Sequence, residues 1–185
     1  QAITADLDAI VARSRGVARQ LNQGIAHLMK KNRIAVHMGT GRIAGPGRVE
    51  VTGDQSAEML EASHIIIATG ARARDLPFAP ADGARIWTYR HAMTPKVLPG
   101  KLLVIGSGAI GIEFASFYND LGVDVTVVEM LDRIVPAEDT DVSAFLEKAL
   151  TKQGITIRTG TGVDSLAVTA DGVTGAYDSS EIGAA

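Results

Sequence analysis

Three glycines and one glutamate carry the clearest chemical signal in this sequence. The pattern Gly-x-Gly-x-x-Gly is formed by Gly106, Ser107, Gly108, Ala109, Ile110 and Gly111. It follows an apolar run and opens a helical pattern, which is the context that makes this motif informative. The first glycine permits a tight turn, the second lets the backbone approach a pyrophosphate, and the third lets the helix pack closely on the strand. Together with the N–H groups at the helix start, the pattern predicts a dinucleotide-binding turn.

Glu129 supplies the second part of this signal. It ends the next apolar run, 23 positions after Gly106, close to the spacing at which an acidic residue accepts hydrogen bonds from a ribose hydroxyl. A carboxylate there repels a 2′-phosphate, so the sequence favours NAD over NADP. We include the neighbouring Met130 in the predicted cofactor site. The alternative is a glycine turn that only packs a helix, with a solvated glutamate at the end of a strand.

The elements around these residues alternate between strand and helix patterns. We expect strands over 101–106, 124–129 and 154–160, and helices over 109–121 and 140–153. This order predicts a parallel βαβαβ unit, the α/β class of Rossmann-like nucleotide-binding domains. The tail beyond it shows a hairpin signal at Asp171-Gly172 and then fades into small polar residues.

The first hundred residues form a different kind of segment. Apolar residues at three- and four-residue steps predict a long amphipathic helix over 4–31, with Thr4 as its N-cap. Short strands are expected over 34–39, 48–51 and 64–70, and the last is apolar throughout, which predicts burial on both faces. A proline-rich stretch over 75–100 is typical of a connector. We place the domain boundary near Pro99, between residues 1–98 and 99–185.

Composition excludes several classes of protein. The chain has 185 residues, 46% of them hydrophobic, and a net charge of −3, which argues against a nucleic-acid partner. It has no cysteine, and therefore no disulfide, thiolate metal site or thiol nucleophile. No His, Asp or Glu cluster has metal-ligand spacing, so we expect no metal. No apolar run is long enough for a membrane helix. We expect a cytoplasmic protein without a membrane association.

Two stretches of the sequence resemble a known family. Residues 104–118, VIGSGAIGIEFASFY, and 121–130, LGVDVTVVEM, are similar to the NAD domain of the flavin-dependent pyridine nucleotide-disulfide oxidoreductases, most of all its dihydrolipoamide dehydrogenase branch. Residues 65–71, IIIATGA, resemble the segment of the family's FAD domain that passes the adenosine end of the flavin. The resemblance implies that 1–98 is part of an FAD-binding domain with its connector, that 99–185 is most of an NAD-binding domain, and that FAD contacts Ala68, Thr69 and Gly70.

The resemblance also implies an activity. Enzymes of this branch serve 2-oxo acid dehydrogenase complexes, and pass electrons from dihydrolipoamide on an acyltransferase subunit through a disulfide and FAD to NAD. They work as homodimers. Glu113 matches a family glutamate that pairs with a lysine beside the flavin, so the resemblance gives it a catalytic role. The cofactors implied are FAD and NAD, and this chain carries the NAD end of the route.

Some family features do not occur in this sequence. They are the FAD-binding glycine turn, the paired redox cysteines, the dimerisation domain with its His-Glu pair, and an apolar strand beyond Gly175. We therefore expect the chain to be a piece of a longer protein, incomplete at the end of its NAD domain and inactive alone. Two alternatives stay open. One is another NADH-linked flavoprotein reductase, of the NADH oxidase or ferredoxin reductase type, and the other is a non-catalytic nucleotide-binding module.

Overall fold

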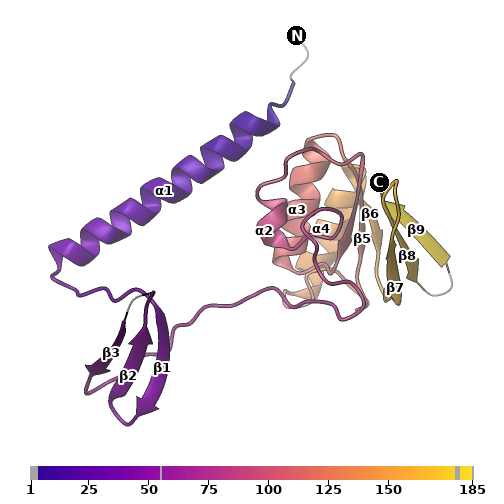
Figure 1. Ribbon diagram of the computed structural model, residues 1–185. Helices are drawn as coiled ribbons and strands as arrows, with labels where there is room; N and C mark the ends of the chain where they lie inside the picture. The colour runs from indigo at the N-terminus through magenta and orange to yellow at the C-terminus, as the bar shows by residue number, and fades with distance from the viewer. Residues whose placement is uncertain (1–3, 55, 178–179, 185) are drawn as a thin grey trace. The chain divides into compact units, whose positions relative to one another are not determined.

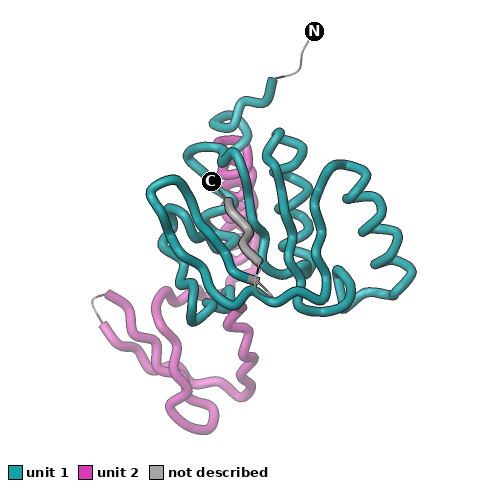
Figure 2. Tube along the Cα trace, turned by 90° about the vertical axis from the view of Figure 1, so that its right-hand side faces the viewer, with its two compact units in different colours: residues 1–11, 73–185 teal, residues 12–72 magenta. Residues whose placement is uncertain are grey.

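The computed structural model describes residues 4–54, 56–177 and 180–184 (Figure 1). Its chain divides into two compact units, one of residues 12–72 and one of residues 1–11 and 73–185 (Figure 2). The helices are α1 (Leu7–Lys31), α2 (Tyr89–Ala92), α3 (Ala109–Asp120) and α4 (Thr140–Lys152). The strands are β1 (Thr40–Gly45), β2 (Arg48–Thr52), β3 (Ala57–Glu61), β4 (Lys101–Ile105), β5 (Asp124–Val128), β6 (Thr156–Arg158), β7 (Ser165–Val168), β8 (Val173–Tyr177) and β9 (Ser180–Ala184).

Helix α1 confirms the predicted long helix but begins later than expected. The Asp6 side chain accepts a hydrogen bond from the N–H of Ala9 at 3.0 Å, so Asp6 and not Thr4 caps the first turn. The helix ends where Arg33 adopts a φ of 56° and the N–H of Ile34 donates to the Met29 carbonyl at 2.9 Å. None of its described residues is buried.

Strands β1, β2 and β3 form an antiparallel sheet in that order. The predicted strand over 48–51 is confirmed as β2, whereas β3 had no counterpart in our expectations. Cross-strand pairs hold the register, with the Arg42 guanidinium donating to the Glu50 carboxylate and Thr52 lying opposite both Thr40 and Ala57.

Two strands expected in the N-terminal half are absent from the described structure. Residues 34–39 and 64–70 have no strand assignment, and the second run is exposed along its length, with Ile66 at 91%. The prediction of a strand buried on both faces at 64–70 is therefore wrong here. Such a strand needs a paired strand on each side and a covering layer on each face, and no strand among the described residues pairs with this run.

The predicted βαβαβ unit is confirmed. Strands β4, β5 and β6 form a parallel sheet in that order, and Ile105 of β4 lies opposite Val128 of β5. Helix α3 packs on β4 and β5, and α4 lies against β6. The carboxyl ends of β4 and β5 therefore lie side by side, which places the glycine turn beside the start of the segment that follows β5.

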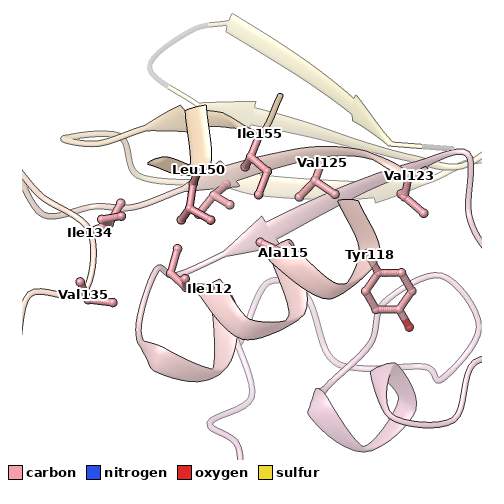
Figure 3. Packing of buried hydrophobic residues seen from close by; sticks show 10 residues of the cluster. Ile112, Ala115, Tyr118, Val123, Val125, Ile134, Val135, Leu150 and Ile155 are labelled. Carbon is pink, nitrogen blue, oxygen red and sulfur yellow. The ribbon is translucent and has the colours of Figure 1, made fainter. Parts of the chain in front are cut away.

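An apolar cluster of buried residues holds this unit together (Figure 3). It joins one face of α3 to β5, to the segment after β5, to α4, and to Ile155 just before β6. Its buried members are Ile112, Ala115, Tyr118, Val123, Val125, Val127, Ile134, Val135, Leu150 and Ile155. The step from Ile112 to Ala115 and on to Tyr118 is the helical three-residue spacing that turns one face of α3 toward the sheet.

The proline-rich connector packs on the same unit. Trp87 lies 6.2 Å from Tyr118 between ring centroids, and the Tyr118 hydroxyl donates to the Ala92 carbonyl of α2 at 2.8 Å. The boundary between the two compact units falls between residues 72 and 73, so the connector belongs to the same unit as the parallel sheet. The domain boundary near Pro99 stays a prediction.

Beyond β6 the chain forms an antiparallel sheet of β7, β8 and β9. The hairpin predicted around Asp171-Gly172 is confirmed, with Val168 opposite Val173. The expectation that the tail has no further strand after the hairpin is wrong. Strand β9 pairs with the whole of β8, from Val173 opposite Ala184 to Tyr177 opposite Ser180. Small and polar residues form this strand because it is paired along its full length by backbone hydrogen bonds.

Candidate dinucleotide-binding site

The turn between β4 and α3 has the backbone shape that its glycines predict. Gly106 has a φ of 94°, a conformation that L side chains rarely adopt, and its N–H donates to the Val128 carbonyl at 2.8 Å. This bond ties the turn to the end of β5. The chain then reverses at Gly108, which is extended at φ −62° and ψ 172° and forms the N-cap of α3.

Gly111 is required by the close approach of helix and turn. A Cβ added at Gly111 would overlap the carbonyl oxygen of Gly106 and would meet the Val104 side chain at 3.4 Å. At Gly108, by contrast, an added Cβ would meet no atom within 4 Å. The chain therefore leaves open space above Gly108, where the motif predicts that a pyrophosphate approaches.

The first turn of α3 offers backbone donors to this space. The first intrahelical bond runs from the N–H of Ile112 to the Gly108 carbonyl at 3.0 Å, and no side chain caps the helix. In the described part of the chain, the N–H groups of Ala109 and Ile110 have no acceptor, and both residues are exposed. These unpaired donors and the positive end of the helix dipole suit an anion.

Glu129 lies directly behind the turn and is nearly buried, at 8% exposure. Its Oε2 accepts two hydrogen bonds from Ser107, from the N–H at 2.8 Å and from the hydroxyl at 2.7 Å. Its Oε1 accepts one from the N–H of Leu131 at 2.9 Å. The sequence placed Glu129 at the end of a strand, and the structure places its carboxylate against the phosphate-binding turn.

These contacts decide the ionisation of Glu129. Burial alone raises the pKa of a carboxyl group, because the charged form loses its water. Here the hydrogen bonds from Leu131 and from Ser107 outweigh burial and hold the pKa of Glu129 below its usual value of 4.5. The site therefore presents a fixed negative charge at neutral pH.

The segment after β5 braces the turn from a third side. The N–H of Val135 donates to the Ser107 carbonyl at 3.0 Å. Val135 is buried and has a φ of 40°, which is costly for a β-branched residue. The Ser143 hydroxyl of α4 donates to the Val135 carbonyl at 3.5 Å. This strained residue links α4 to the turn.

The structure brings together only part of the predicted site. Gly106, Ser107, Gly108 and Glu129 meet at the carboxyl ends of β4 and β5, and Met130 lies beside them with 73% of its surface exposed. Glu113 is on the exposed face of α3, one turn beyond Ala109. Its catalytic role stays a prediction.

The residues expected to contact FAD are in the other unit. Ala68, Thr69 and Gly70 are exposed and lie in a segment without regular structure. A Cβ added at Gly70 would meet no atom within 4 Å, so nothing in the described chain encloses this segment. The described residues therefore do not form an FAD pocket by themselves, and the FAD contacts stay a prediction from the resemblance.

Two further expectations concern absences. In the ranges 4–54, 56–177 and 180–184, no group of three or more His, Cys, Asp or Glu side chains could hold a metal ion. The same ranges contain no helix of the length and hydropathy needed to cross a bilayer. The expected absence of a metal and the expected cytoplasmic location both remain predictions.

Sequence reasoning missed the contacts of Ser107, Leu131 and Val135. Ser107 was grouped with the cofactor ligands, but both of its donors point to Glu129. The only sequence signal was a hydroxyl residue at a position of the motif where any residue is allowed. The N–H groups of Leu131 and Val135 give no such signal, because every residue except proline has one.

Comparison with known proteins identifies relatives along the whole chain. The family model described as pyridine nucleotide-disulphide oxidoreductase matches residues 1–182. Dihydrolipoyl dehydrogenase of Zymomonas mobilis is 51% identical over 91% of this chain, and that of Rhizobium etli is 44% identical over 95%. The crystal structure of LpdA from Mycobacterium tuberculosis superposes with a TM-score of 0.89 at 32% identity over 98% of the chain.

The relatives are much longer than this chain. The matched region amounts to 36% of the Zymomonas protein, 40% of the Rhizobium protein and 41% of the Mycobacterium structure. The similarity therefore concerns about two fifths of each relative.

Proposed function

The chain belongs to the pyridine nucleotide-disulphide oxidoreductase family, and on that premise we propose that it carries the NAD site of a dihydrolipoyl dehydrogenase. The observation that supports this most strongly is the position of Glu129. Its carboxylate lies behind the glycine turn and is held there by Ser107 and Leu131. A carboxylate fixed at this point accepts a hydrogen bond from a ribose hydroxyl and repels a 2′-phosphate.

The residues present fit an NAD molecule. The open space above Gly108 admits the pyrophosphate, and the unpaired N–H groups of Ala109 and Ile110 donate to it. Glu129 then lies where the adenosine ribose follows. Gly106 and Gly111 shape the turn and do not need to touch the ligand. The task of this chain is to bind and orient NAD, and NAD supplies the hydride acceptor.

For the whole protein we propose the activity that the curated relatives are named for. Electrons from dihydrolipoamide, carried on an acyltransferase subunit of a 2-oxo acid dehydrogenase complex, pass through a disulfide and FAD to NAD. We propose a homodimer as the working form. The 51% identity to the Zymomonas enzyme supports this activity over the NADH oxidase and ferredoxin reductase types.

Glu113 and the segment at 68–70 complete this proposal. Glu113 is exposed on α3, and we propose that it pairs with a lysine near the flavin of the whole protein. Ala68, Thr69 and Gly70 are proposed to contact FAD. Both assignments rest on the family resemblance, because the described residues enclose no flavin site.

Calorimetric titration with NAD and with NADP tests the nucleotide site. We expect this chain to bind NAD and to bind NADP at least about tenfold more weakly, because Glu129 repels the 2′-phosphate. In Glu129→Ala we expect NAD affinity to fall by about 10- to 100-fold, the usual cost of losing a hydrogen bond to a charged group.

A matched control is Asp132→Ala. It removes another carboxylate three positions along the chain, but the Asp132 side chain is 90% exposed and pairs with Arg133 at 3.9 Å. We expect NAD affinity to stay within about twofold of the wild-type value. If the wild-type chain bound neither nucleotide, or bound NADP as well as NAD, the proposed site would be wrong.

A further inference from the structure

The glycine motif does not require a hydrogen bond between the side chains of Ser107 and Glu129, yet the structure contains one. We propose that Ser107 is a positioning residue that holds one oxygen of the Glu129 carboxylate, so that the other oxygen alone is left to read the adenosine ribose. This inference deepens the proposed NAD site and rests on it. It assigns a specificity-determining role to a motif position whose residue type the motif leaves free.

The first argument is the count of hydrogen bonds on the carboxylate. An ionised carboxylate offers about four acceptor positions, two on each oxygen. Oε2 accepts from the Ser107 N–H at 2.8 Å and from its hydroxyl at 2.7 Å, which fills both of its positions. Oε1 accepts one hydrogen bond within 3.5 Å, from the Leu131 N–H at 2.9 Å, and so keeps one position beside the weaker contact of the carboxylate with the Met130 N–H. A ribose hydroxyl can therefore be read at Oε1 without breaking any existing bond.

The second argument is that both partners are fixed by their backbones. The Ser107 carbonyl accepts from the Val135 N–H at 3.0 Å, and Gly106 just before it donates to Val128 at 2.8 Å. The Glu129 N–H donates to the Arg158 carbonyl at 2.8 Å, and its carbonyl accepts from Thr161 at 2.8 Å. The carboxylate is thus held between two rigid segments, which is how a binding group is preorganised.

The third argument is burial. The Ser107 side chain is fully buried, so its hydroxyl cannot reach a bound nucleotide and its donors are committed to Glu129. The phosphate donors of the turn are then the N–H groups that follow, from Gly108 onward. Ser107 acts on the ribose only through the orientation of Glu129.

The test compares two ligands in two proteins. The ligands are NAD and an NAD analogue whose adenosine ribose lacks its 2′- and 3′-hydroxyls. In Ser107→Ala, which keeps the N–H and removes the hydroxyl, we expect calorimetric NAD affinity to fall about three- to tenfold, the usual effect of losing one hydrogen bond. Affinity for the analogue should change by less than about twofold, because the analogue has no hydroxyl for Glu129 to read.

Controls separate positioning from a general structural role. Thr169→Ala removes another side-chain hydroxyl, one that bonds to Gly172 in the hairpin between β7 and β8, and it should leave both affinities within about twofold. Ser107→Gly also lacks the hydroxyl and should reproduce the selective loss. If Ser107→Ala did not fold, as judged by thermal unfolding, the comparison of the two ligands would be made with Ser107→Gly.

The outcomes distinguish this inference from the proposed function. Equal loss of both ligands in Ser107→Ala and Ser107→Gly, or no loss of either, would overturn the positioning role while leaving the NAD site intact. A wild-type chain that bound no NAD would overturn both. A wild-type chain that bound NAD and the analogue equally would show that Glu129 does not read the ribose, and would also overturn the positioning role.

Discussion

At the scale of single residues, the glycines of the turn perform separate physical tasks. Gly106 is needed for its positive φ, Gly111 for the close approach of the Gly106 carbonyl, and Gly108 for the open space above it. The motif requires glycine at all three positions. The structure shows that Gly106 and Gly111 are needed for the fold of the turn, and we propose that Gly108 is needed for ligand binding.

A pair of alanine substitutions tests this separation. Gly111→Ala should lower the free energy of unfolding by about 1–3 kcal/mol, because the new methyl group overlaps backbone. Gly108→Ala should change it by less than about 1 kcal/mol, since no atom lies within 4 Å, yet weaken NAD binding about tenfold or more. Denaturant unfolding and calorimetry measure the two effects. Unchanged NAD affinity in Gly108→Ala would contradict the placement of the pyrophosphate.

The ionisation of Glu129 predicts how the stability of the folded chain changes at low pH. Hydrogen bonds hold its folded-state pKa below the usual 4.5, so the unfolded chain binds a proton at this group more readily. The stabilisation is fully present above the unfolded pKa and is lost as pH falls through the folded pKa. Asp82 also has a lowered pKa, from the N–H groups of Ile86, Ala84 and Arg85, which outweigh burial. The acid dependence of the wild type therefore has more than one source.

Comparison with Glu129→Gln isolates this contribution. The difference in unfolding free energy between the two proteins should be constant from about pH 6 to 8 and should shrink as pH falls below the unfolded value. Urea unfolding at a series of pH values measures it. A difference that did not vary between pH 7 and pH 3 would show that the Glu129 carboxylate is not stabilised in the folded chain.

The residue scale also shows how far sequence reasoning reaches. The glycines and Glu129 could be predicted, because the motif fixes their spacing and each has a stated physical task. The hydrogen bonds from Ser107 to Glu129 and from Val135 to Ser107 could not, because they join segments 22 or more positions apart and depend on how β4 and β5 pair. Spacing alone does not show which way a buried hydroxyl points.

At the scale of elements, Tyr118 of α3 joins the connector to the parallel sheet. Its ring is fully buried among Trp87, Phe114 and Phe117, and its hydroxyl donates to the Ala92 carbonyl at 2.8 Å. Burial raises the pKa of Tyr118 to about 12. One hydroxyl therefore anchors the short helix α2.

Tyr118→Phe should lower the free energy of unfolding by about 1 kcal/mol, because the Ala92 carbonyl loses its partner. It should also remove the tyrosine that titrates at about pH 12 from an alkaline absorbance titration. Tyr89→Phe is the matched control, since its hydroxyl makes only a 3.3 Å exposed contact with Arg90, and should cost less than about 0.5 kcal/mol. Equal stability of wild type and Tyr118→Phe would show that this bond does not anchor α2.

Elements were predictable where their partners are close in sequence. The order β4, α3, β5, α4 and β6 follows from local periodicity, because each strand pairs with one that is a single helix away. The run at 64–70 misled the prediction, because an apolar composition shows what a strand could bury and not whether neighbours pair with it. Strand β9 was missed for the opposite reason, since pairing with β8 outweighs its composition.

At the scale of the whole molecule, the buried cluster lies entirely in one unit. Every residue of the cluster and every partly buried hydrophobic packed against it has a number of 87 or higher. Helix α1 has no buried residue among those described. Stability against unfolding should therefore come mainly from residues 73–185.

A shortened protein of residues 73–185 tests this. We expect its thermal unfolding midpoint to lie within a few degrees of the full chain and its NAD affinity to be unchanged within about twofold. Amide exchange in the full chain should be fast along α1 and slow in β5 and α3. A shortened protein that did not fold would show that residues before 73 contribute to the core.

The hydrogen-bonded carboxylate of Glu129 has a consequence for protein engineering. An arginine in place of the acidic residue would supply the positive charge that a 2′-phosphate needs. Here that exchange would leave the two buried donors of Ser107 without an acceptor, each at a cost of about 1–3 kcal/mol, and would also free the part-buried N–H of Leu131. Coenzyme choice and thermal tolerance are thus linked through one side chain. A redesign must supply a new acceptor for these donors together with the new charge.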